Sequence, residues 1–117
     1  AFARDASSAL ESIRARTKAA LVLKRGAQGA QVHDGLERFS AAPYPVEVLN
    51  VLGAGDGFAS GLLLGWLSGW PWDRTLACAH AVGAIVVTRH GCSVAIPTRA
   101  EVDEFLKARG RSGAPGR

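Results

Sequence analysis

Apolar and polar positions in the first third of the chain predict one helix followed by a group of short strands. Residues 6–16 place alanine, leucine and isoleucine on one helical face, with the charged side chains elsewhere. The apolar runs at 19–23 and 29–33 are separated by a segment that contains Gly26, and they predict a buried strand, a turn and a returning strand. Residues 36–40 form a further candidate strand.

A proline-rich stretch and a glycine turn introduce the helical half of the chain. Pro43 and Pro45 favour an extended backbone, so residues 46–49 are expected to belong to the sheet. Beyond the glycine turn at 53–55, apolar residues recur at helical spacing until Gly69. This spacing predicts a long helix that the chain enters directly from the turn.

Two further helices are indicated toward the end of the chain. Asp73 is placed to cap the first, which carries small residues along one face and is expected to end near Gly91. Thr98 and Glu101 have the spacing of a capping box, and this predicts a last helix over residues 98–108.

The overall composition narrows the class of protein. With 117 residues, 48% of them hydrophobic and 21% charged, the chain is long enough for one modest core. The net charge of +4 is spread without a basic run, so no nucleic-acid partner is expected, whereas a polyphosphate fits the mild basicity. Cys78 and Cys92 are expected to be reduced thiols, and no apolar stretch is long enough to cross a bilayer. We therefore expect a cytoplasmic protein with no membrane partner.

Candidate chemistry is concentrated in residues 50–58, where an apolar strand end leads into small residues and then into a helix. The first amides of a helix lack intrahelical acceptors and the helix dipole favours negative charge there, so this turn can bind a phosphate or a developing oxyanion. Asp56 lies at the same point and could accept a proton from a substrate hydroxyl, as phosphoryl transfer requires. The same side chain could instead cap its helix, and the turn alone leaves both roles open.

Other phosphate-binding patterns fit this turn poorly. The sequence lacks the GxxxxGK and following Ser or Thr of a P-loop, and Phe58 stands where GxGxxG requires its third glycine. Asn-Val-Leu-Gly-Ala-Gly-Asp at 50–56 instead resembles the DTxGAGD signature of ribokinase-like (PfkB family) sugar kinases. Segments 24–30, 79–84 and 88–97 resemble, in turn, the family's strand-turn-strand beside the ATP phosphates and ribose, its adenine-flanking helix and its cation-binding closing loop.

The resemblance implies an α/β fold, the carboxy-terminal portion of a ribokinase-like doubly wound sheet with flanking helices. It implies that Asp56 is the catalytic base, that Gly53, Ala54 and Gly55 form an anion hole, and that ATP and Mg²⁺ are required. The implied nucleotide-binding residues are Lys24, Gly26, Gly29, His80 and Gly83, and the backbone carbonyls of Asn50, Leu52, Arg89 and Gly91 are candidates to hold a monovalent cation such as K⁺. Asn50 replaces the signature's first Asp, which weakens any cation site that depends on that charge.

The substrate and the extent of the kinase also follow from the resemblance. The runs at 48–56 and 89–92 are most similar to the family's kinases of 5-dehydro-2-deoxygluconate, a sugar acid of inositol catabolism. The family's sugar-binding glycines, lid strands and magnesium-associated NxxE segment do not occur in these residues. Residues 1–109 are therefore expected to be the nucleotide-binding carboxy-terminal part of a sugar kinase, inactive alone, with a disordered tail at 110–117.

Exposed apolar surface is a second consequence of that division. A sheet without its amino-terminal strands has an unpaired edge and uncovered helices, so self-association is expected. Trp66, Trp70 and Trp72 are expected to pack the end of the first long helix or, if exposed together, to mark the contact of a homodimer.

Two other classes of function remain open from the sequence. A non-catalytic module would bind a nucleotide or another anion through the same turn, and ATP binding without turnover would identify it. A structural or assembly domain would use the turn only to join strand to helix, and no nucleotide would then protect the turn.

Overall fold

The computed structural model describes residues 5–110. Its main elements follow in the order α1 (Ala6–Arg14), β1 (Leu21–Lys24), β2 (Ala30–Asp34), β3 (Glu37–Ala41), α2 (Ala54–Leu67), α3 (Trp72–Val87) and α4 (Arg99–Ala108). Short 3-10 helices lie at Gly26–Gln28 and Ser93–Ala95. The order of helices and strands expected from the apolar pattern is confirmed except at residues 46–49, and the ends of the elements shift by a few residues.

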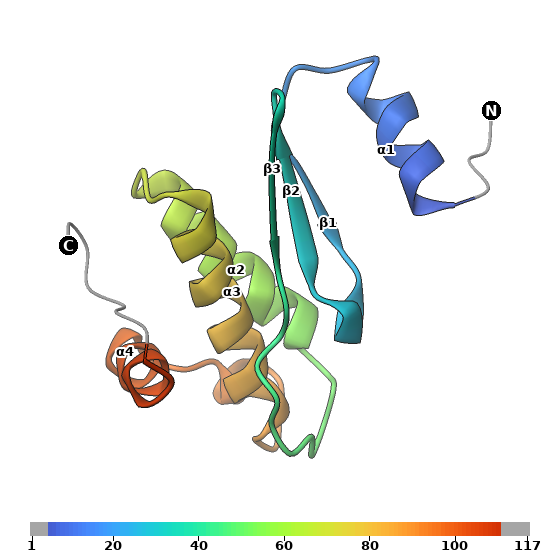
Figure 1. The fold of residues 1–117 in the computed structure, drawn as a ribbon. Coiled ribbons are helices and arrows are strands. Elements are labelled where there is room, and N and C mark those ends of the chain that lie inside the picture. The colour runs from blue at the N-terminus through green and yellow to red at the C-terminus, as the bar shows by residue number, and fades with distance from the viewer. Residues whose placement is uncertain (1–4, 111–117) are drawn as a thin grey trace.

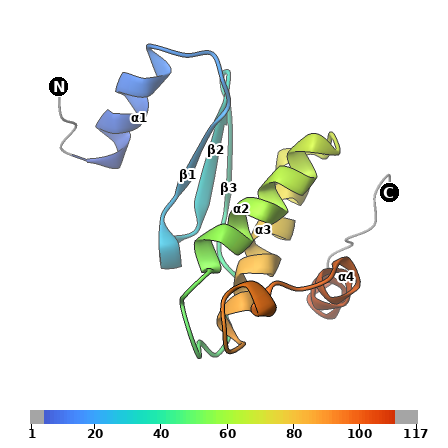
Figure 2. The same cartoon turned by 180° about the vertical axis from the view of Figure 1, so that it is seen from behind.

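The strands form one antiparallel sheet in the order β1-β2-β3. Val32 in the central strand lies opposite Val22 on one side and Phe39 on the other. Figure 1 shows α2 and α3 side by side on one face of this sheet and α1 on the other, and Figure 2 shows the same layers from behind. The parallel strands of a doubly wound sheet are not among the residues described.

The core between the sheet and the helices follows from the two-residue period of a strand. Ala30 and Val32 of β2 point to the same face and are buried. They join Phe58 of α2 with Leu76 and Ala79 of α3 in one apolar cluster. This packing sets the first turn of α2 beside the end of the sheet.

Helix α1 is attached to the opposite face by polar contacts. Asp5 caps it by accepting a hydrogen bond from the Ser8 amide at 2.8 Å. At its other end, the Arg14 guanidinium donates to the carbonyl oxygens of His33 at 2.6 Å and Ala19 at 3.0 Å. No residue of α1 is buried, so these bonds rather than an apolar core hold the helix to the sheet.

Helices α2 and α3 approach closely because glycine lines their contact. A Cβ atom placed on Gly61 would lie 2.8 Å from the Ala79 Cα, and one on Gly65 would lie 2.5 Å from the Thr75 Oγ1. Thr75 and Ala79 are themselves fully buried. The expected small-residue face of the second long helix therefore has a partner, and that partner is α2.

The starts of α3 and α4 differ in how they are capped. The capping box of α4 is confirmed, because Thr98 and Glu101 bond reciprocally. The expected cap of α3 is wrong: its N-cap residue is Pro71, without a side-chain hydrogen bond, and Asp73 lies within the first turn. Proline suits that position because its fixed φ matches the entry to a helix. Helix α3 ends at Val87, short of Gly91.

The assignment of residues 46–49 to the sheet is wrong. No strand covers residues 42–53, the segment that leads from β3 to α2. Pro43 and Pro45 have no amide hydrogen to donate, and the amides of Leu49 and Asn50 both donate to the Val87 carbonyl, at 2.8 and 3.1 Å. The segment is thus bound to the end of α3 rather than to a neighbouring strand.

The tryptophans occupy separate environments. Trp66 is 58% exposed, whereas Trp70 stacks under the Arg74 guanidinium at 3.8 Å from its ring centroid. Trp72 donates from Nε1 to the Asp34 carboxylate at 2.8 Å and so ties α3 to β2. Apart from Gly110, the expected tail at 110–117 lies outside the described residues. Over the range 5–110, no helix has both the length and the apolar character needed to cross a lipid bilayer.

Candidate active site

A cavity of about 490 Å³ opens where the end of the sheet, the 42–53 segment and the first turns of α2 meet. Its walls come from segments far apart in the sequence. Of the residues predicted to bind nucleotide or anion, it is lined by Lys24, Gly26, Gly29, Ala54, Gly55, His80 and Gly83. Gly53 and Asp56 flank Ala54 and Gly55 but do not line the cavity.

The turn between β1 and β2 requires glycine at one end. Gly29 has φ 90° and ψ −151°, and a Cβ atom there would lie 2.1 Å from the Ala41 carbonyl oxygen. The turn is closed by the Arg25 amide, which donates to the Gly29 carbonyl at 2.8 Å. Any side chain at Gly29 would push this rim of the cavity away from the sheet.

The entry into α2 leaves backbone donors unpaired. Gly53 is its N-cap residue, in the left-handed region at φ 85°. The Ala54 amide donates to the Val51 carbonyl at 3.2 Å, and the Gly57 amide donates to the Gly53 carbonyl at 2.9 Å. Among the described residues, the amides of Gly55 and Asp56 have no such partner. The amide of Gly53 has no partner there either, so the unpaired amides of residues 53–56 are those of Gly53, Gly55 and Asp56.

Asp56 lies exposed in this same first turn. The alternative in which it caps α2 is wrong, because Gly53 is the N-cap residue and no side chain bonds the helix start. Within residues 5–110, its carboxylate takes part in no hydrogen bond or ion pair. A carboxylate beside unpaired amides at a helix N-terminus is free to accept a proton from a group held there.

Lys24 brings a positive charge to the same place from the end of β1. Its Nζ donates to the Gly55 carbonyl oxygen at 3.2 Å and lies 5.5 Å from the centroid of the Phe58 ring. In the part of the chain that is described, it forms no salt bridge with a carboxylate. An anion bound at the first turn of α2 would therefore meet an ammonium group as well as backbone amides.

His80 forms an inner wall of the cavity on α3. It is 6% exposed, and its ring packs edge-on against Phe58 with centroids 5.0 Å apart. Burial lowers the pKa of the imidazole, and a hydrogen bond to the Ala41 carbonyl opposes that shift. Its Nε2 is buried and has no hydrogen-bond partner among the described residues. His80 thus places a buried nitrogen without a hydrogen-bond partner in a wall that is otherwise mainly apolar.

The candidate cation loop lies next to the predicted anion hole, and its four candidate residues do not line the cavity. The 49–50 backbone is bonded to Val87, and a Cβ atom on Gly53 would lie 3.0 Å from the Cys92 Sγ, so residues 50–53 adjoin residues 87–92. The Asn50 Oδ1 accepts a hydrogen bond from the Leu52 amide at 3.0 Å. Over residues 5–110, no group of three or more His, Cys, Asp or Glu side chains could hold a metal ion.

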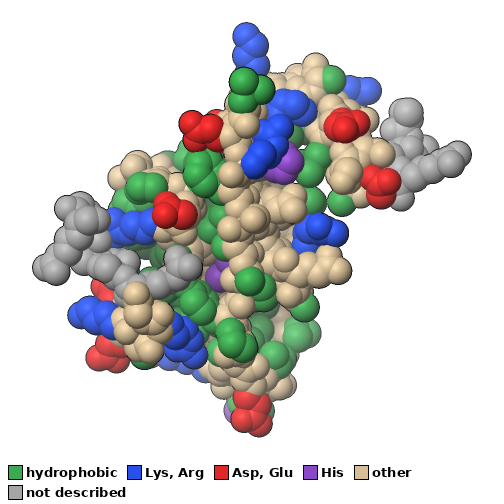
Figure 3. Space-filling view, viewed as in Figure 1, with side chains coloured by type: hydrophobic (Ala, Val, Ile, Leu, Met, Phe, Trp, Pro, Cys, Tyr) green, Lys and Arg blue, Asp and Glu red, His purple; other side chains and the backbone are tan. Residues whose placement is uncertain are grey.

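Sequence reasoning missed the wall opposite His80. That wall belongs to the segment between β3 and α2, and its cavity-lining residues are Pro43, Tyr44, Pro45, Val46, Val48 and Val51. Figure 3 shows hydrophobic side chains on the surface of the lower part of the molecule, where this segment runs. The signal in the sequence is an apolar stretch that directly follows two prolines, a pattern that favours a strand as much as the wall of a pocket.

Comparison with known proteins places these features in context. The family model described as "pfkB family carbohydrate kinase" matches residues 3–99. The chain is 31% identical over 98 residues to a 5-dehydro-2-deoxygluconokinase of Geobacillus kaustophilus, with 83% of this chain and 29% of that protein covered. It is 37% identical over 89 residues to the enzyme of the same name from Bacillus licheniformis, with 75% and 27% covered.

The chain is also similar in fold to a solved kinase structure. The chain is similar to a putative ribokinase II of E. coli in complex with ATP and Mg²⁺, with a TM-score of 0.84, 29% identity, and 91% of this chain and 34% of that one covered. The expected fold, part of a ribokinase-like α/β fold, is thereby confirmed. The chain spans between a quarter and about a third of the length of the proteins it matches.

Proposed function

The chain belongs to the pfkB family of carbohydrate kinases, and from this premise we propose that the full-length protein transfers the γ-phosphoryl group of ATP to a hydroxyl of a sugar or sugar acid. The names of its relatives make 5-dehydro-2-deoxygluconate the proposed acceptor. One observation carries the mechanism: the unpartnered carboxylate of Asp56 stands in the same helical turn as the unpaired amides of Gly55 and Asp56.

In this mechanism Asp56 is the catalytic base. It takes the proton of the acceptor hydroxyl as the hydroxyl oxygen attacks the γ-phosphorus, and the bond to the β-phosphate oxygen breaks. The free amides and the α2 dipole stabilise the negative charge on the transferring group. Lys24 lies where its positive ammonium group would attract the negatively charged phosphates of ATP. We assign the anion hole to the 53–56 turn on this basis.

The cavity is the proposed nucleotide site. Gly26 and Gly29 lie on the rim of the cavity, which would follow the phosphates and ribose of ATP. His80 and Gly83 belong to the wall formed by α3, where apolar neighbours suit the adenine ring. The proposed site is contained within residues 1–109, which we regard as the nucleotide-binding part of the kinase. The 117-residue chain alone is expected to bind ATP without turnover, because the sugar contacts are proposed to lie elsewhere in the full-length protein.

Metal ions enter the proposal in a limited way. Since the described residues contain no cluster of three or more metal-binding side chains, we propose that Mg²⁺ arrives with the ATP phosphates. It would supply charge neutralisation between the β- and γ-phosphates. A monovalent cation such as K⁺ would depend on the carbonyls of Asn50, Leu52, Arg89 and Gly91, whose segments adjoin one another.

The test is phosphoryl transfer by the full-length protein to a panel of sugars and keto-sugar acids, before and after Asp56→Asn. We expect kcat to fall by about 10²-fold or more, with the KM for ATP nearly unchanged, because general-base catalysis is lost while the nucleotide site is kept. Asp73→Asn is the matched control: it also removes an exposed carboxylate from the first turn of a helix, but on α3 and away from the 53–56 turn. A D56N protein with parental kcat would refute the assigned base, and a parent inactive on every acceptor would refute the kinase proposal.

A further inference from the structure

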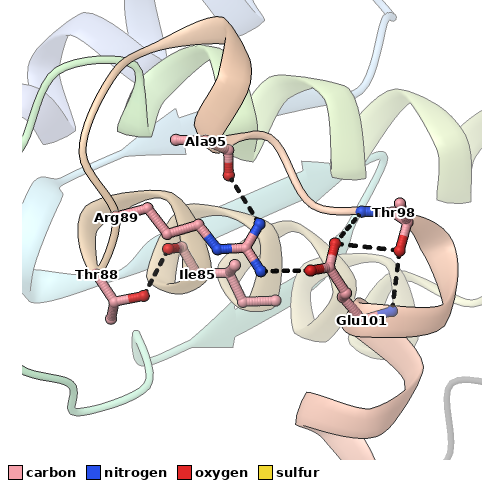
Figure 4. Close-up of polar contacts among 6 residues, drawn as sticks. All are labelled: Ile85, Thr88, Arg89, Ala95, Thr98 and Glu101. Atoms are coloured by element: carbon pink, nitrogen blue, oxygen red, sulfur yellow. Dashed lines mark hydrogen bonds and ion pairs between the residues drawn. The ribbon is translucent and has the colours of Figure 1, made fainter.

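Glu101 does more than cap α4. One carboxylate oxygen, Oε2, accepts from the Thr98 amide at 2.6 Å and from the Thr98 Oγ1 at 3.1 Å. The other, Oε1, accepts from the Arg89 Nη2 at 2.6 Å (Figure 4). The Thr98 amide, followed by the Arg89 side chain, lowers the pKa of Glu101 to about 2, so the carboxylate is charged at any working pH. A capping box needs only Oε2, the oxygen that bonds Thr98, so the bond from Oε1 to Arg89 is additional.

Arg89 uses this second bond to bracket the loop after α3. Its own amide donates to the Val86 carbonyl at 3.1 Å, and its Nη1 donates to the Ala95 carbonyl at 3.4 Å. Together with Glu101, these bonds connect the end of α3, the 3-10 helix and the start of α4 through one side chain (Figure 4). The 90–94 stretch that they enclose is exposed and has little other support.

The bracketed loop lies against the start of α2. The position of a Cβ atom on Gly53 lies 3.0 Å from the Cys92 Sγ and 3.6 Å from the Cys92 Cα. Gly53 is the residue from which the helix starts, and the free amides of Gly55 and Asp56 follow it directly. A shift of Cys92 would therefore move the N-cap or leave it unsupported.

We propose that Glu101 is a positioning residue for phosphoryl transfer: through Arg89 it holds residues 89–92 against Gly53 and thereby fixes the anion-binding amides and Asp56. This rests on the proposed function. Glu101 neither lines the cavity nor contacts Asp56. Its effect is therefore on the geometry of phosphoryl transfer and not on the binding of the adenine ring of ATP. A small misplacement of such groups costs one to two orders of magnitude in rate.

The variant Glu101→Gln separates the two roles of the side chain. The carbonyl oxygen of glutamine can still accept a hydrogen bond from Thr98. The side chain carries no charge, so its ionic bond to Arg89 is lost. In the full-length protein we expect kcat to fall about tenfold, with the KM for ATP within about twofold and the melting temperature nearly parental. Asp103→Asn, which removes the Arg99–Asp103 ion pair from the same helix, is the control and is expected to behave as the parent.

A double-mutant cycle tests whether the effect passes through Arg89. Arg89→Gln and the double variant R89Q/E101Q are expected to lose about the same kcat as E101Q, because the same contact is broken in each. Additive losses, a parental kcat in E101Q, or a kcat loss matched by a large loss of melting temperature would each overturn the inference. An active parent with an unaffected E101Q would overturn only this inference, whereas an inactive parent would overturn the proposed function with it.

Discussion

His80 combines burial with an unsatisfied ring nitrogen. Within residues 5–110, its Nε2 is buried and has no hydrogen-bond partner. Because burial is the larger influence, the folded protein holds the ring neutral at pH values where an exposed histidine becomes protonated. A buried polar atom of this kind costs stability unless a ligand or water satisfies it.

The pH dependence of stability follows from that lowered pKa. Below the ordinary value of 6.5 the unfolded chain binds a proton that folded His80 does not, so stability falls as the pH drops from about 6.5 toward the folded pKa. His80→Asn keeps a polar side chain at this position but does not titrate. We expect the urea midpoint of the full-length protein to fall less between pH 7.5 and 5.5 in this variant than in the parent. Equal falls in the two proteins would contradict the assignment.

The contact between α2 and α3 depends on two positions without side chains. Gly61 and Gly65 face Ala79 and Thr75 at distances that leave no room for a methyl group. The neighbouring atom at Gly61 is backbone, which cannot rotate away as a flexible side chain can. This contact also fixes the direction in which the first turn of α2 points, and with it the position of Asp56.

A methyl group at Gly61 should therefore destabilise the fold. Although alanine favours helix more than glycine does, we expect Gly61→Ala to lower the free energy of unfolding by about 1–3 kcal/mol, because the two helices must separate. Gly83→Ala is the matched control on α3, since its Cβ would meet its nearest atom at an ordinary 3.5 Å. Chemical unfolding should show a loss only in the first variant; a G61A protein as stable as G83A would refute the close packing.

The molecule as a whole presents more apolar surface than its size explains. Beyond its first two turns, helix α2 carries large apolar residues on several sides, and a helix of that kind is normally buried. One side meets α3 and the sheet, but Leu63, Leu64, Trp66 and Leu67 are exposed, with Leu67 at 77%. Strand β1 is also an edge of the sheet. Both features agree with the expectation that the 117-residue chain self-associates.

Self-association should respond to a charge in the α2 patch. Leu67→Lys is expected to weaken association of the 117-residue chain by about tenfold, because it removes a large apolar side chain from the surface that association would bury. Leu36→Lys is the control, since Leu36 is 98% exposed on the hairpin turn and outside the patch. Sedimentation velocity over a range of concentrations measures both. Equal behaviour of the two variants would exclude the α2 patch as the contact.

Local patterns in the sequence determined the order of the elements, the capping box of α4, the glycine turn before α2 and the family resemblance. These features depend on residues a few positions apart, whose spacing alone selects a helix, a turn or a cap. The errors arose where the deciding partner was distant. The pattern at 46–49 predicts a strand, but the Leu49 amide bonds Val87, which lies far along the chain. The position of Asp73 predicts a cap, but Pro71 is the N-cap residue of α3.

Only the tertiary structure decided which distant residues meet. It brings Lys24 of β1 to Gly55 of α2, sets His80 in the wall of a cavity, and joins Glu101 of α4 to Arg89. These contacts arise from the packing of α2 and α3 on the sheet, and apolar periodicity specifies that a face is buried without specifying what it meets. The sequence therefore indicated the chemistry of the turn, whereas the packed fold determined which side chains support it.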